Sequence, residues 1–134
     1  MPAYVVLVTA PAGEKAAAIA RSLVEQKLAA CVNRVPGVLS TYAWQGSLVV
    51  DEAEELLLIK TDKTRFKALV KAVKALHPAS VPEVLALRVK EGERSYLHWL
   101  LESVQAPRKK QRRPAGLPKK ARPSKPSPTL KETA

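Results

Sequence analysis

Residues 38–60 read VLSTYAWQGSLVVDEAEELLLIK, and this stretch decides the fold. Gln45 and Gly46 suit a tight turn between two strand-like runs, 29–44 and 48–60. Each arm is long, at about 14 residues against the 5 or 6 of an ordinary strand. Pro36 and Gly37 interrupt the first arm, where a bulge or bend fits best. The stretch therefore predicts an antiparallel hairpin of unusual length.

The flanking segments add helices and further strands on both sides of this hairpin. Residues 3–9 form an almost wholly apolar, β-branched run that predicts a central strand. Apolar residues at spacings of three and four predict amphipathic helices over 14–27 and 66–76, the second of them capped by Thr61-Asp62 and ended by Pro78. A strand at 84–89 and a short helix around 96–100 follow. The order β-α-β-β-α-β plus a helix predicts an α+β, ferredoxin-like sandwich.

Two helices can cover only one face of such a sheet, yet the second hairpin arm is apolar on both faces. Leu56, Leu57, Leu58 and Ile59 are consecutive, so alternate side chains point to opposite faces. An uncovered apolar face is unfavourable in water. We therefore expect a homo-oligomer that packs sheet against sheet.

The composition divides the chain in two. Residues 1–106 hold thirteen Lys and Arg against eleven Asp and Glu, a net charge of +2, whereas 107–134 hold ten against one, a net charge of +9. Six of the eleven prolines lie in this second part. We expect a folded domain over 1–105 and a basic, Pro-rich disordered tail over 106–134. The tail could make weak, nonspecific contacts with nucleic acid or an anionic surface.

Other classes of protein are disfavoured. The single cysteine and the lack of a signal-peptide pattern lead us to expect a cytoplasmic protein. No apolar run is long enough to span a membrane. The chain has no phosphate-binding glycine loop, no nucleophile elbow and no HExxH motif, so we do not expect an enzyme.

Several short motifs occur in order along the chain. They are Ala29-Ala30-Cys31-Val32-Asn33 before Pro36-Gly37, Ser40-x-Tyr42-x-Trp44-x-Gly46, Ile59-Lys60-Thr61, His77-Pro78, Pro82-Glu83 and Tyr96-Leu97-x-Trp99. Together they resemble the motifs of the CutA divalent-cation tolerance family. Each motif is weak alone, but the ordered combination over about residues 3–104 is highly specific.

This resemblance implies a compact homotrimer, similar in build to the PII signalling proteins, in which long hairpins of neighbouring subunits pair. It also implies a role in the tolerance of copper and other divalent metals. The motif positions suggest a ligand cleft between subunits and two candidate metal ligands. The cleft residues are Tyr42, Trp44, Lys60, Glu83, Tyr96 and Trp99, and the metal ligands are Cys31 and His77.

Two positions depart from the family pattern. Some members have a cysteine and a second histidine where this chain has Val8 and Leu76, so a copper site built from those groups lacks two ligands here. The candidates also have structural interpretations. Cys31 could be a small buried apolar residue, and His77 could cap its helix. The cleft aromatics could pack an interface, where Lys60 and Glu83 could form an ion pair.

The sequence thus predicts a non-catalytic trimer involved in metal-ion tolerance that could bind copper. Two alternatives stay open at this point. A PII-like module could bind a small anionic ligand or a partner protein in the cleft between subunits. The tail could instead make the chain a weak binder of polyanions.

Overall fold

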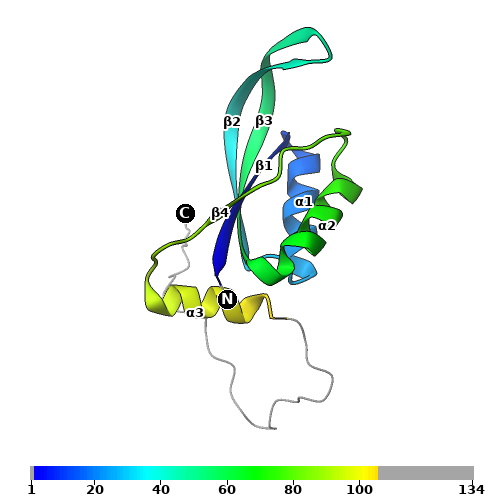
Figure 1. Cartoon of the computed structure of the whole chain (residues 1–134). Helices are drawn as coiled ribbons and strands as arrows, with labels where there is room; N and C mark the ends of the chain where they lie inside the picture. Colours follow the sequence, from blue (N-terminus) through cyan, green and yellow to red (C-terminus); the bar gives the residue numbers. More distant parts are fainter. Residues whose placement is uncertain (1, 106–134) are drawn as a thin grey trace, which may run out of the picture.

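The computed structural model describes residues 2–105, which form one four-stranded antiparallel sheet with two of the three α-helices on one side and the third near one end (Figure 1). The elements are β1 (Ala3–Pro11), α1 (Glu14–Glu25), β2 (Cys31–Trp44), β3 (Ser47–Asp62), the single 3-10 turn η1 (Lys63–Arg65), α2 (Phe66–Leu76), β4 (Leu85–Arg88) and α3 (Arg94–Ser103). The strands pair in the order β2-β3-β1-β4, all antiparallel. The predicted ferredoxin-like α+β fold is confirmed. The predicted tail, 106–134, lies outside the described residues.

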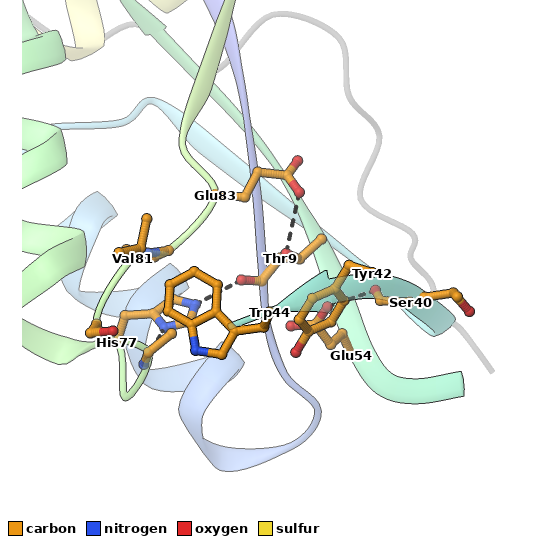
Figure 2. Close-up of a pocket in the computed structure, with 12 residues that line it drawn as sticks. Thr9, Ser40, Tyr42, Trp44, Glu54, His77, Val81 and Glu83 are labelled. Carbon is orange, nitrogen blue, oxygen red and sulfur yellow. Dashed lines mark hydrogen bonds between the residues drawn. The ribbon is translucent and has the colours of Figure 1, made fainter. Parts of the chain in front are cut away.

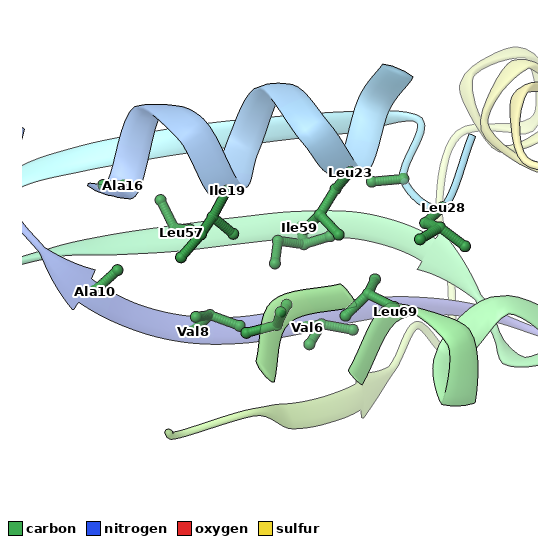
Figure 3. Packing of buried hydrophobic residues seen from close by; sticks show 12 residues of the cluster. Val6, Val8, Ala10, Ala16, Ile19, Leu23, Leu28, Leu57, Ile59 and Leu69 are labelled. Carbon is green, nitrogen blue, oxygen red and sulfur yellow. The ribbon is translucent and has the colours of Figure 1, made fainter. Parts of the chain in front are cut away.

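The core lies between the sheet and the two helices α1 and α2. Ile19 and Leu23 of α1 meet Leu57 and Ile59 of β3, and all four side chains are fully buried (Figure 3). Val6 and Val8 of β1 and Leu69 and Val73 of α2 complete this cluster. The two helices therefore cover a single face of the sheet, as the order of elements predicts.

The hairpin β2–β3 extends well beyond the helices, as Figure 1 shows. Gln45 and Gly46 make its tight turn with φ of 51° and 83°, both in the left-handed region that type I′ turns require. The pairing shifts between Val35 and Val38, where β2 holds one more residue than β3. Gly37, with φ of 82°, lies in this bulge. The predicted turn and bulge are both confirmed.

The opposite face of the sheet, which we call the open face, has no helix over it. Residues directly opposite each other across antiparallel strands point to the same face, so the register fixes its membership. The open face consists of Val5, Leu7 and Thr9 (β1), Leu56, Leu58 and Lys60 (β3), Cys31, Asn33 and Val35 (β2), and Leu85 and Leu87 (β4). Leu85 and Leu87 are 56% and 54% exposed. Within the described chain, β1 is thus a central strand covered on one face only.

Glu55 fastens the hairpin to the start of α1 on the helix side. Its carboxylate accepts hydrogen bonds from Arg34 Nε at 2.7 Å, Arg34 Nη2 at 2.9 Å and the backbone N–H of Gly13 at 2.9 Å. The Arg34 guanidinium, aided by the Gly13 N–H, lowers the pKa of Glu55 to about 2. The pair joins the base of the hairpin to the β1–α1 turn.

We predict that Glu55→Gln lowers the free energy of unfolding at neutral pH by roughly 1–3 kcal/mol, because charge-assisted hydrogen bonds are lost. Since folding lowers the pKa of Glu55, its stabilisation is present above the unfolded value of 4.5 and disappears as the pH falls toward about 2. Urea unfolding of both proteins across this pH range measures the difference.

Glu25→Gln is the matched control for this experiment. Glu25 forms an exposed i,i+4 pair with Arg21 at 2.8 Å, and such pairs contribute about 0.5 kcal/mol or less. A difference between wild type and Glu55→Gln that widened on acidification would contradict the assignment.

Candidate functional site

A cavity of about 490 Å³ lies beside the open face, between the hairpin and the segment that joins α2 to β4 (Figure 2). Its wall comes from three stretches of chain that are far apart in the sequence. The lining residues are Thr9 of β1, Ser40, Thr41, Tyr42 and Trp44 of β2, Glu54 of β3, and His77, Ala79, Ser80, Val81, Pro82 and Glu83 of the α2–β4 segment. We call this cavity the hairpin pocket.

The hairpin supplies two aromatic rings and the Glu54 carboxylate to the pocket. Ser40 Oγ donates to Glu54 Oε1 at 2.6 Å, which fixes the Glu54 carboxylate against β2. The Tyr42 hydroxyl donates to Glu52. This hydrogen bond, assisted by burial and by the negative charges of Glu52 and Glu54, raises the pKa of Tyr42 above its ordinary value. Tyr42 therefore stays neutral at physiological pH, with its hydroxyl directed to a carboxylate.

The α2–β4 segment supplies the other wall. Glu83 accepts a long hydrogen bond of 3.4 Å from Thr9 Oγ1. His77 Nε2 lies 2.7 Å from the carbonyl oxygen of Thr9, and His77 Nδ1 accepts from the backbone N–H of Ala79 at 3.0 Å. A carbonyl can only accept and an amide N–H can only donate, so Nε2 carries the proton of a neutral imidazole. His77 thus fastens the segment to β1 through Nε2 and holds the turn of the segment itself through Nδ1.

The charges in the pocket have one sign. Glu54 and Glu83 are its carboxylates, and no Lys or Arg belongs to its lining. Within residues 2–105 neither carboxylate takes part in an ion pair, since the pairs there are Arg21–Glu25, Arg34–Glu55 and His98–Glu102. At neutral pH the pocket is therefore a site of negative potential with two aromatic rings beside it.

Three of the six predicted cleft residues meet in this pocket, namely Tyr42, Trp44 and Glu83. Lys60 lies elsewhere on the open face, opposite Cys31, and its Nζ donates to Asn33 Oδ1. Tyr96 and Trp99 lie on α3, where their rings pack at a centroid distance of 5.5 Å. Within one subunit the structure does not bring these three residues into the pocket. The ion pair suggested for Lys60 and Glu83 belongs to an interface between subunits and stays a prediction.

The two predicted metal ligands are also separated. Cys31 is half-buried on the open face, where it lies in the same row across the sheet as Lys60 and Val5. His77 instead contacts Thr9, which follows Val5 by four residues along β1. Four strand residues span about 14 Å. No group of three or more His, Cys, Asp and Glu side chains within residues 2–105 is placed to hold a metal ion. With both His77 nitrogens occupied, one subunit does not fit a copper site built from Cys31 and His77.

The sequence analysis did not identify Thr9 and Glu54 as pocket residues. The sequence did contain a signal for the position of Glu54. Side chains alternate between the two faces of a strand, so Glu54 points to the same open face as Leu56, Leu58 and Lys60 of β3. The bulge at Gly37 then brings Ser40 alongside Glu54. The proximity of Ser40 and Glu54 depends on the pairing register of β2 and β3 beyond the bulge, and the sequence does not specify this register.

The fold and this site define a ferredoxin-like α+β protein with an extended hairpin and an acidic, aromatic pocket beside its uncovered sheet face. Comparison with known sequences agrees in detail. The family model described as CutA1 divalent ion tolerance protein matches residues 4–103. The chain therefore belongs to the CutA1 divalent ion tolerance family, and the resemblance drawn from the motifs is confirmed.

Individual relatives extend over the same region. The divalent-cation tolerance protein CutA of Thermus thermophilus is 56% identical over 100 residues, which cover 75% of this chain and 96% of the relative. Its solved structure aligns with a TM-score of 0.74 at 53% identity, over 77% of this chain and 99% of that chain. The chloroplastic rice protein CutA 1 is 49% identical over 104 residues, or 78% of this chain, but these span only 58% of that relative. The crystal structure of rice CutA1 aligns over 78% of this chain and 95% of that chain, with a TM-score of 0.75 at 48% identity.

We predict that His77→Ala lowers the free energy of unfolding by roughly 1–2 kcal/mol, because the Thr9 carbonyl and the Ala79 N–H lose their shared partner. Chemical denaturation measures the change. Nitrogen-15 NMR of the imidazole should show the proton on Nε2.

His98→Ala is the control, since His98 is exposed on α3 beside Glu102 and surface substitutions of this kind stay within about 0.5 kcal/mol. A proton on Nδ1 of His77, or equal effects of the two substitutions, would contradict the role assigned to His77.

Proposed function

We propose that this protein acts in divalent-cation tolerance as a non-catalytic, cytoplasmic homotrimer. Family membership supports the tolerance role, because relatives such as the Thermus thermophilus protein are named for it. The sequence supports a non-catalytic role, since it has none of the nucleophile, phosphate-loop or zinc-protease motifs named above. The single cysteine supports a reducing compartment.

The open face is the observation that carries the proposed assembly. Its middle rows are formed by Val5, Leu7, Leu58, Leu85 and Leu87, and no described element covers them. Burying apolar surface contributes about 25 cal/mol per Å², so covering this face with copies of itself is strongly favoured. A closed ring of identical subunits leaves no such face exposed. The resemblance to PII-like trimers sets the number of subunits at three.

No helix among residues 2–105 combines the length and apolarity needed to cross a bilayer. In our proposal the apolar open face is an interface between protein subunits, in which one sheet packs on another.

Copper is the ion that we propose to test first. A thiolate is a ligand that copper(I) favours, and Cys31 is half-buried rather than enclosed in the core. Its Sγ lies 4.0 Å from Asn33 Oδ1, on the face that the proposed trimer brings together. His77 does not belong to this proposal as a ligand of the same ion, because of its distance and its two hydrogen bonds.

The alternatives drawn from the sequence receive less support. A pocket with two carboxylates and no Lys or Arg in its lining does not favour a small anionic ligand. Contacts of the basic tail with polyanions concern residues outside the described range. Metal-ion tolerance through a trimer therefore stays the main proposal.

The assembly is tested by light scattering on the full chain, which should give about three times the chain mass of 14.6 kDa. We predict that the double variant Leu85→Lys/Leu87→Lys lowers this mass, because two exposed leucines of the open face become charged.

Val24→Lys is the control for this variant. Val24 is 42% exposed on α1, on the other side of the molecule, so its substitution should leave the mass unchanged. A monomeric wild-type protein, or an unchanged mass for the double variant, would refute the proposed interface.

Titration with copper(I) under reducing conditions tests the metal contact. We predict that Cys31→Ser weakens binding roughly tenfold or more, whereas His77→Gln leaves the isotherm unchanged because its nitrogens are committed elsewhere. Equal losses in both variants would mean that Cys31 and His77 of different subunits share one ion. Tight binding unaffected by Cys31→Ser would remove the thiol from the proposal.

A further inference from the structure

We propose that the outer surface of α2 is a contact site for the phosphate backbone of a double-stranded nucleic acid. The site consists of Lys67, Lys71 and Lys74, which we call the lysine stripe. It lies on the helix side of the sheet, whereas the proposed subunit interface, the hairpin pocket and Cys31 belong to the other side (Figure 1). The stripe therefore stays accessible when subunits pack on the open face.

The packing of α2 directs its lysines away from the protein. Leu69 and Val73 of this helix are fully buried in the core. Residues three and four apart share one face of a helix, and the stripe follows this spacing on the side opposite the two buried residues. All three lysines are exposed, and the exposed residues beside them on α2, Ala68 and Ala75, are small. A long molecule can therefore approach closely along the helix.

The positive charge of the domain is concentrated in this one segment. Residues 63–76 hold five of the thirteen Lys and Arg of residues 1–106 and none of the eleven Asp and Glu. The rest of that range is therefore acidic, with eight Lys and Arg against eleven Asp and Glu. Within residues 2–105 no lysine of the stripe takes part in an ion pair. The small net charge of the domain thus conceals an uncompensated basic surface.

The stripe lowers the stability of its own helix. Lys67 lies in the first turn of α2, where the helix dipole favours acidic side chains, and this turn contains none. Lys67 and Lys71, four residues apart, also repel each other. The core does not need these charges, because the lysines are exposed to solvent. Like charges that oppose the local preference of their helix indicate a role in contact with an anionic partner.

The composition of this surface favours nucleic acid among the anionic partners. Interfaces between proteins are rich in aromatic residues and poor in lysine, whereas this face of α2 offers lysine and alanine. A helix that binds a membrane inserts its apolar face, and the apolar face of α2 lies in the core.

The spacing of the lysines suits a phosphate backbone. The helical rise separates successive lysines by about 6 and 4.5 Å along the axis. A duplex carries one phosphate charge per roughly 1.7 Å of its axis, so each lysine can reach a phosphate. The net charge of +9 over residues 107–134 favours the same partner. Contacts with phosphates carry no base information, so we expect binding that is independent of base sequence.

The experiment measures the binding of a short, fluorescein-labelled DNA duplex to the full-length chain by fluorescence anisotropy, over a series of salt concentrations. We expect Lys67→Gln/Lys71→Gln to raise the dissociation constant roughly tenfold at about 0.1 M salt. The slope of log K against log salt should fall by about two, because two phosphate contacts are lost.

Lys90→Gln/Arg94→Gln is the matched control, since it removes the same charge from exposed residues outside α2. Its dissociation constant should change less than about twofold, because exposed charges more than about 10 Å away are screened at this salt concentration. Both double variants keep the basic residues of 107–134. Circular dichroism melts verify that each variant is folded.

Four results would overturn the proposal. Equal weakening by the two double variants would show a general effect of net charge, and an unchanged salt slope for the α2 variant would assign binding to other basic residues. Tighter binding to poly-glutamate or to phosphatidylserine vesicles than to the duplex would point to an acidic protein or a membrane. The fourth result is a folded protein that does not bind the duplex at low salt.

Light scattering on the same samples reports the assembly separately. Because the stripe belongs to a single subunit, a monomeric protein would refute the proposed trimer and leave this test intact.

Discussion

The alternation of side chains along β3 is the constraint on which the other features depend. Leu57 and Ile59 point to α1 and α2 and form the middle of the core, while Leu56 and Leu58 between them point to the open face. One strand therefore serves two apolar surfaces at once. Glu55 and Glu54 continue the same alternation, the first toward Arg34 and Gly13 and the second toward the pocket. The position of this strand therefore determines the core, the contact of Glu55 with Arg34 and Gly13, the proposed interface and the pocket.

The proposed interface and the hairpin pocket lie on the same side of the sheet, at different positions along the strands. The open face is apolar in its middle rows, has Lys60 at one end and has the carboxylates and hydroxyls of the hairpin pocket at the other. Subunits that pack on the middle rows would bring neighbouring residues close to both ends.

The sequence predicted the architecture well because the relevant signals are local. The turn at Gln45-Gly46, the bulge at Gly37 and the helical stripes are all encoded within a few residues. The site was predicted only in part, because its composition depends on register between distant strands. Tyr42, Trp44 and Glu83 meet within one subunit, whereas the predicted cleft lay between subunits, and Lys60 lies in another row. The hydrogen bonds that occupy both nitrogens of His77 depend on a loop conformation that no motif specifies.

The bulge at Gly37 and the alternation of side chains along β3 together limit where residues can be inserted or deleted in this chain. A one-residue insertion between Glu54 and Lys60 would exchange the two faces of β3, turning core leucines outward and drawing the acidic pocket residue inward. Beyond the bulge, near Gln45 and Gly46, the hairpin contacts no helix, and added or deleted pairs of residues would leave the parity below unchanged. Within one subunit, length changes beyond the bulge therefore leave the core in place, whereas the seven residues from Glu54 to Lys60 are held to a fixed count.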